Sequence, residues 1–163
     1  MTWIRSALVA IVALLLMLAA VGCGSSHRSA TRPGTGIRAL AADYLAIARP
    51  ANDRLDVEVS AYSKAAHHNL AVAAAALRAE AATERHFDRQ LAAIPFPPTI
   101  AATADALIRV NEIRARLADQ QAAARSIPAL LSFAGSHQAA DGEVEAQVRV
   151  IRAELGLPPP STS

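Results

Sequence analysis

The chain has 163 residues, a formal net charge of +2 at neutral pH and a single cysteine. One cysteine forms no internal disulfide, which excludes the class of small secreted domains held together by disulfide frameworks. From Ile37 onward 13 basic residues stand against 14 acidic ones, and no arginine-rich face with interleaved aromatic residues occurs, so we expect no nucleic acid partner.

The first 23 residues, MTWIRSALVAIVALLLMLAAVGC, have the pattern of an export signal. Arg5 and the amino group supply positive charge, and an uninterrupted apolar run extends from Ala7 to Val21. The run is shorter than the roughly 20 residues that a membrane-spanning helix needs, and a polar segment follows it. Two alternatives stay open: an ordinary secretory signal in which Cys23 is incidental, and an N-terminal anchor helix.

The end of this segment, Leu18-Ala19-Ala20-Val21-Gly22-Cys23, resembles the lipobox of bacterial lipoproteins. This resemblance implies that residues 1–22 are a signal peptide, and that Cys23 carries acyl chains such as palmitate after cleavage. Two or more acyl chains give durable anchoring. We therefore expect a lipoprotein on the extracytoplasmic face of the cell membrane, with the membrane as a partner through the N-terminal lipid anchor.

A polar segment follows Cys23. Residues 24–36, GSSHRSATRPGTG, are rich in Gly, Ser and Thr and cannot bury apolar surface, so we predict a flexible tether over residues 23–36. Arg28 and Arg32 belong to it and are either solvated or in contact with anionic lipid headgroups.

Residues 37–157 are predicted to form one helical domain. They are rich in alanine, the best helix former, and apolar residues recur at steps of three and four in four segments. Pro95, Pro97 and Pro98 end the second helix, and Thr99 is expected to cap the third. The predicted fold is all-α, an up-down four-helix bundle, with residues 158–163 as a disordered tail.

The other boundaries carry weaker or more local signals. Pro50 is expected to kink the first helix or to split it into two pieces. The turn to the second helix is placed near residues 66–69, in which His67 and His68 are solvated. Ser126 followed by Pro128 predicts a helix start. Gly135 and Gly142 suggest that the last helix begins as a separate short piece, and Gly156-Leu157-Pro158 is expected to close it.

Two segments carry a second resemblance. Residues 44–52, YLAIARPAN, and the ending Leu155-Gly156-Leu157-Pro158-Pro159 are similar to uncharacterised helical lipoproteins of high-GC Gram-positive bacteria. This resemblance implies a location and a fold. It implies no catalytic residue.

Motifs of known enzymes do not occur in the sequence. A nucleophile elbow, a phosphate-binding loop, a dinucleotide fingerprint and a zinc-protease motif are all missing. A ferritin-like di-metal bundle needs Glu-x-x-His pairs, whereas Glu84 and His86 are only two residues apart and face different sides of a helix. His86, next to Arg85 and Asp88, is predicted on a charged outer face.

Five polar residues interrupt the apolar stripes and are predicted to meet in one layer of the bundle. They are Glu80, Glu84, Arg114, His137 and Asp141. Buried charges are costly unless they are paired, so a structural Glu–Arg pair is one interpretation of this layer. A pocket for a ligand or a metal ion is the other. A rotation of one helix by one position would separate these residues.

The expected function is that of a binding or structural module whose partner is an envelope protein or a small ligand. We expect no enzymatic activity, no cofactor and no metal site. The alternative is an envelope enzyme, or a protein that binds a metal or a small ligand, acting through the polar layer.

Overall fold

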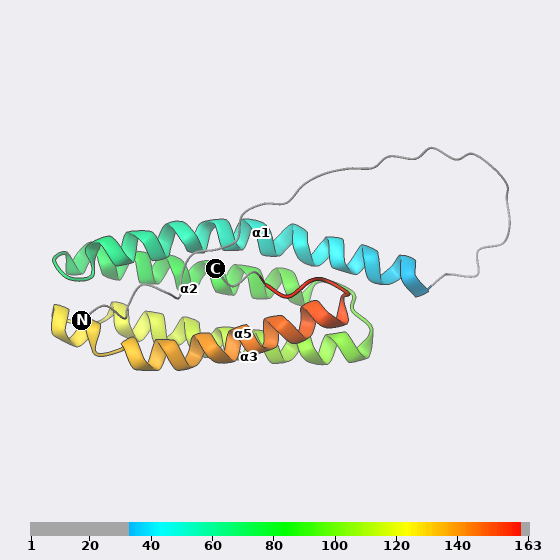
Figure 1. Ribbon diagram of the computed structural model, residues 1–163. Helices are drawn as coiled ribbons and strands as arrows, with labels where there is room; N and C mark the ends of the chain where they lie inside the picture. Colours follow the sequence, from blue (N-terminus) through cyan, green and yellow to red (C-terminus); the bar gives the residue numbers. More distant parts are fainter. Residues whose placement is uncertain (1–32, 161–163) are drawn as a thin grey trace, which may run out of the picture.

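The computed structural model describes residues 33–160, which contain five α-helices and no strand (Figure 1). They are α1 (Pro33–Ala65), α2 (Leu70–Ala92), α3 (Pro98–Ala122), α4 (Ile127–Leu131) and α5 (Ala134–Glu154). The prediction of an all-helical fold is confirmed for this part of the chain. None of the described helices is long and apolar enough to cross a membrane. The predicted signal peptide, Cys23 and residues 24–32 lie outside the described residues, as do residues 161–163.

Two predicted helix boundaries are confirmed by their caps. The turn between α1 and α2 falls at residues 66–69, where the Oδ1 atom of Asn69 accepts a hydrogen bond of 3.1 Å from the Val72 amide. At the start of α4 the Oγ atom of Ser126 accepts one of 3.3 Å from the Ala129 amide. Both side chains satisfy amide groups that have no partner inside their helix.

Two predictions about where helices begin are wrong. α1 begins at Pro33, inside the segment 23–36 that we predicted as a tether; proline suits this place because the first turn of a helix needs no amide donor from it. At Pro50, where we predicted a kink or a split, α1 continues without a break, which excludes the split. α3 begins at Pro98, one residue before Thr99, and Pro97 stands at the cap position; Pro98 suits the first helical position for the same reason as Pro33.

The last helix differs from the prediction in where its short first piece ends. α4 is indeed separate, but the break lies at Ser132 and Phe133, and α5 continues through Gly135 and Gly142. Neither glycine has a positive φ, so both are compatible with a regular helix.

The end of α5 is a Schellman motif. Gly156 has a φ of 67°, which a glycine adopts without steric cost. The Leu157 amide donates to the Arg152 carbonyl at 2.8 Å, and the Gly156 amide donates to the Ala153 carbonyl at 3.0 Å. The Nε atom of Arg152 then donates to the Pro158 carbonyl at 2.8 Å. The expectation of a disordered tail from residue 158 is therefore wrong at its start, because this bond attaches Pro158 to α5.

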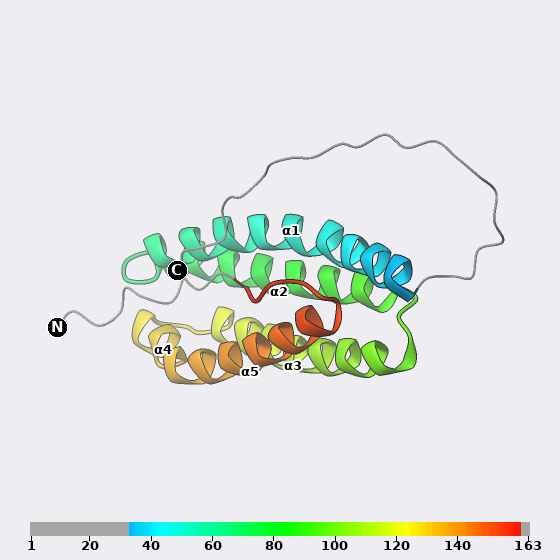
Figure 2. The same cartoon turned by 45° about the vertical axis from the view of Figure 1, so that its right-hand side comes forward.

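The four long helices pack in chain order into a helical bundle. α1 lies along α2, α2 along α3, and α3 along α5, whereas α1 and α5 make little direct contact. Figure 2 shows the C-terminal residues, in red, returning along the side of the bundle between α1 and α5. α1 and α5 are therefore not packed directly against each other.

The core consists of two apolar clusters, one toward each end of the bundle. One is almost entirely alanine and surrounds Leu77 and Leu130. The other contains larger side chains, among them Tyr44, Leu107 and Ile151. The buried residues between these clusters along α2 and α3 are polar, and they belong to the candidate site; they are Thr83, Glu84, Asp88 and Asn111.

Candidate functional site

Arg114 on α3 is the centre of the polar layer. Its Nη2 atom lies 2.6 Å from Glu80 Oε1, its Nε atom lies 2.5 Å from Asp141 Oδ1, and its Nη1 atom pairs with Glu84 Oε1. The side chains of Glu80 and Glu84 are each only 5% exposed, and that of Arg114 is 15% exposed. One guanidinium group therefore holds three carboxylates from two other helices.

The sequence pattern explains why these charges are inside. Glu80 and Glu84 are one helical turn apart and continue the stripe that contains Leu77 and Leu91, so burying the apolar stripe of α2 also buries the two carboxylates. Arg114 faces them because α3 packs along α2. Four of the five residues predicted for the layer are joined by these ion pairs.

His137, the fifth, lies close to the cluster but is not joined to it. It is half-buried near the start of α5, and its Nε2 atom is buried without a hydrogen-bond partner among the described residues. Burial lowers the pKa of His137, and the charge of Arg114 acts in the same direction, whereas Glu80 and Asp141 oppose them. The imidazole is therefore held toward its neutral form.

A second buried polar pair, which the sequence analysis missed, joins α2 and α3. The Nδ2 atom of Asn111 donates to Asp88 Oδ1 at 2.8 Å, and both residues are buried. Burial raises the pKa of Asp88 from 3.8 to about 6, against the opposing effect of the hydrogen bond from Asn111. Our placement of Asp88 on a charged outer face is wrong, although His86 is exposed as predicted. The four-residue step from Glu84 to Asp88 was the available signal.

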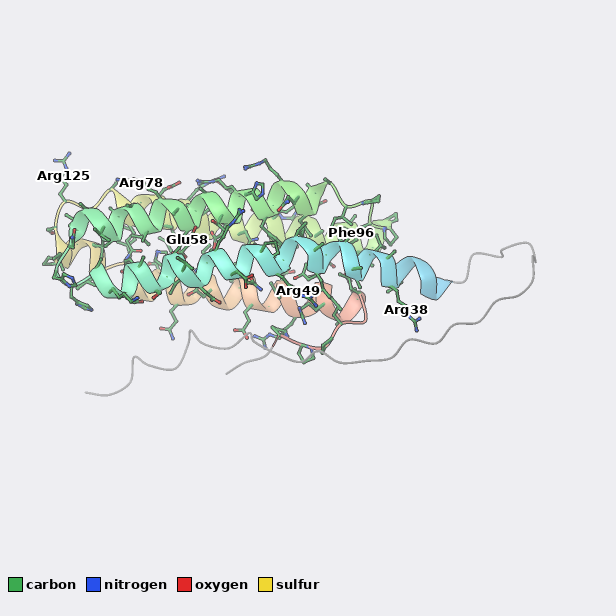
Figure 3. All side chains as sticks on the ribbon, turned by 90° about the horizontal axis from the view of Figure 1, so that it is seen from above. Arg38, Arg49, Glu58, Arg78, Phe96 and Arg125 are labelled. Atoms are coloured by element: carbon green, nitrogen blue, oxygen red, sulfur yellow. The ribbon has the colours of Figure 1, made fainter. Side chains whose placement is uncertain are left out.

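Two further polar contacts, which were also missed, connect α1 to α2 and to α3. The Thr83 hydroxyl donates to Glu58 Oε1 at 2.8 Å, and Glu58 lies on the α2 side of α1 in Figure 3. Burial raises the pKa of Glu58, and the nearby charge of Glu80 adds to this effect. The amide of Gln121 donates to the Tyr62 hydroxyl at 2.8 Å. Neither contact is predictable from the pattern of one helix, because each depends on how two helices are placed beside each other.

A groove of about 310 Å³ opens over the polar layer, between α1 and α5. Seen from above in Figure 3, α2 lies on one side of α1 and α5 on the other. Apolar side chains from all four long helices form much of the groove wall, among them Leu55, Phe87, Leu107, Val144 and Val148. Its volume is at the lower end of the range of about 300–1,000 Å³ that is typical of small-molecule sites.

The groove has more acidic than basic side chains. Four carboxylates line it, those of Asp56, Glu84, Asp141 and Glu145, against the guanidinium groups of Arg114 and Arg152. Arg114 is already occupied by carboxylates. Arg152 lies at the far end, where it donates to the Pro158 carbonyl.

Glu84 is the buried charge that lines the groove with an unused acceptor. Its Oε1 atom pairs with Arg114, but its Oε2 atom is buried and has no hydrogen-bond partner in the described part of the chain. A buried carboxylate oxygen without a donor is unfavourable, and such atoms in native proteins call for a partner. No three His, Cys, Asp or Glu side chains within residues 33–160 are placed to hold a metal ion.

The comparisons with known proteins add no assignment. No protein family model matches the chain. No curated protein and no solved structure matches it either. The resemblances to bacterial lipoproteins therefore stay predictions from the sequence, and the geometry of the groove carries the functional argument.

Proposed function

We propose that this protein is a lipid-anchored binding module of the cell envelope, with the groove between α1 and α5 as its ligand site. The observation that carries the binding role is Glu84, a buried side chain that lines a largely apolar groove and keeps one carboxylate oxygen without a donor. A pocket with apolar walls and few polar groups is the usual form of a small-molecule site.

We further propose that the four long helices form an up-down four-helix bundle in which α1 bends at Pro50. Packing in chain order and the short connections between successive helices support this topology. Pro50 lacks the amide that would bond to the preceding turn, which favours a bend there. The bend changes the course of α1 beside Ala51 and Asn52, which line the groove.

The proposed anchor is Cys23. Support comes from the apolar run of residues 7–21 and from the lipobox-like ending at Gly22, together with the polar residues that follow. A lipid at Cys23 would hold the bundle close to the extracytoplasmic face of the membrane, because only a short stretch of sequence separates Cys23 from α1.

The polar layer favours binding over catalysis. Glu80, Glu84 and Asp141 are all engaged by Arg114, so their charges are used to hold α2, α3 and α5 together. A catalytic acid or base needs a proton that is free to move to a reacting group. We therefore assign stability to the ion pairs of the layer and ligand binding to the groove, whose lining includes Glu84 of that layer.

The anchoring part of the proposal is tested by expressing the full chain in a bacterium that processes lipoproteins. The wild type should sediment with membranes, and the intact mass of the mature protein should equal that of a chain starting at Cys23 plus its acyl groups. Cys23→Ala should be released from membranes or retain residues 1–22. Ser25→Ala is the matched control and should behave as the wild type. A mature wild type without lipid, or with another first residue, contradicts the anchor.

A further inference from the structure

The ligand class follows from the chemistry of the groove, and this inference rests on the proposed binding function. We propose that the groove binds a small organic ammonium ion, whose N–H group donates to Glu84 Oε2 and whose hydrocarbon part lies against Leu55, Phe87 and Val148.

The unpartnered oxygen requires a hydrogen-bond donor. Glu84 lines the groove, but its Oε2 atom is itself buried, so a donor from the groove reaches Oε2 only when the wall beside Glu84 moves aside. The nearest cationic side chain, Arg114, already pairs with Oε1 of the same carboxylate and with Glu80 and Asp141. A donor with a positive charge makes the stronger bond to a carboxylate, so the ligand should carry that charge itself.

The charge balance of the lining selects a cation over an anion. Four carboxylates against two guanidinium groups leave the groove with two more negative than positive side chains. Both guanidinium groups are engaged, Arg114 by carboxylates and Arg152 by the Pro158 carbonyl. An anionic ligand would enter a net negative groove in which neither cation is free to receive it.

The remaining wall requires an apolar body on the ligand. Phe87 follows Glu84 by three residues on α2, so the ring and the carboxylate lie on the same side of that helix. Burial of hydrocarbon against Phe87, Leu55 and Val148 stabilises the complex, and an aromatic ring near a cation adds an attractive contact. A purely polar cation, such as an inorganic ion, would leave this wall exposed.

The experiment uses three probes of similar size that differ in the polar group: phenethylamine, phenylethanol and phenylpropionate. Their binding to the full chain in detergent micelles is measured by titration calorimetry. We expect phenethylamine to bind at least tenfold more tightly than the other two. Glu84→Gln should weaken amine binding by about tenfold or more, since a charge-assisted bond is lost. Glu112→Gln is the matched control, because Glu112 lies outside the groove and should leave binding unchanged.

A second pair of variants tests the location independently of charge. Val148→Phe fills the groove and should abolish amine binding, whereas Val150→Phe makes the same change at an exposed site on the same helix and should not. Circular dichroism of each variant shows whether it has folded. The result for the Val148 and Val150 variants does not depend on the result for the Glu84 and Glu112 variants.

The possible outcomes separate this inference from the proposed function. If all three probes bind equally and Val148→Phe abolishes their binding, the groove is a ligand site without preference for cations and the ammonium inference is overturned. If amine selectivity survives Glu84→Gln, the assignment of Glu84 is overturned. If no probe binds, or if Val148→Phe changes nothing, the ammonium inference and the binding role of the groove both fail.

Discussion

Glu80 and Arg114 form an ion pair between α2 and α3, with Oε1 and Nη2 2.6 Å apart and both side chains largely removed from water. The pair is not isolated, because the same guanidinium also holds Glu84 and Asp141. Removing a buried charge is costly mainly through the partner that it leaves uncompensated. The three carboxylates share one cation, so removing the cation should destabilise the protein much more than removing one carboxylate.

Arg114→Met is expected to destabilise the protein by about 3–5 kcal/mol, because it leaves Glu80 and Glu84 buried without a counter-charge. Glu80→Gln should cost clearly less, since Arg114 keeps two carboxylates. The measurement is urea unfolding of both variants at pH 7. Arg116→Met is the control: Arg116 is 68% exposed and pairs with Glu112, so its loss should cost less than about 1 kcal/mol. Equal costs for Arg114→Met and Glu80→Gln would contradict the shared-cation arrangement.

Replacing the whole buried cluster by apolar groups should recover much of this loss. The triple variant Glu80→Leu, Glu84→Leu and Arg114→Met removes every largely buried charge of the cluster and leaves only Asp141, whose side chain is 50% exposed. Apolar replacements of buried ion pairs are often neutral or stabilising. We expect the triple variant to be more stable than Arg114→Met by at least 2 kcal/mol, again by urea unfolding. A triple variant that is less stable than Arg114→Met would mean that these positions need polar partners.

The positions of the polar layer were predictable from helical periodicity, whereas their meeting also depends on how α2, α3 and α5 are rotated against one another. Glu80 and Glu84 interrupt a stripe on one helix, and Arg114 interrupts the stripe on another, so each position is readable within its own segment. Asp88 has the same step from Glu84, but we predicted it on a charged outer face together with Arg85 and His86. Its burial depends on Asn111, which lies on another helix.

The groove was not predictable, because it is a property of how far apart two helices lie. Whether α1 closes against α5 depends on the volume of the side chains between them and on the course of each helix, and neither follows from the pattern of one segment. The alanines along α1 let it pack closely on α2. The same small side chains, Ala48 and Ala51, fill little of the space toward α5.

Two glycines should respond to alanine with opposite signs. Gly156 has a φ of 67°, where a Cβ atom is strained, so Gly156→Ala should destabilise the protein by about 1 kcal/mol. Gly142 lies inside α5, and an added Cβ there meets no atom within 4 Å. Gly142→Ala should stabilise the protein by about 0.5–1 kcal/mol through helix propensity. Thermal unfolding of both variants against the wild type is the test. Stabilisation by Gly156→Ala would contradict the assigned end of α5, and destabilisation by Gly142→Ala would contradict the position of Gly142 inside this helix.

The last prediction concerns the buried Asp88, whose pKa rises from 3.8 to about 6 in the folded protein. Between pH 4 and pH 6 the folded protein holds a proton that the unfolded chain has released. The free energy of unfolding should therefore decrease as the pH rises through this window, by roughly 2–3 kcal/mol from this group. Asp88→Asn keeps an acceptor for Asn111 and does not titrate, so it should lack this decrease.

Other groups titrate nearby, and the comparison must separate them. The raised pKa of Glu58 acts with the same sign as that of Asp88, whereas the lowered pKa of His137 destabilises the folded state as the pH falls below about 6.5. Both are present in the wild type and in Asp88→Asn. Urea unfolding of the two proteins at pH 4, 5, 6 and 7.5 therefore isolates Asp88 in the difference between their unfolding free energies. The stability of the variant relative to the wild type should increase from pH 4 to pH 7.5. A difference that does not change with pH would contradict the burial of Asp88 beside Asn111.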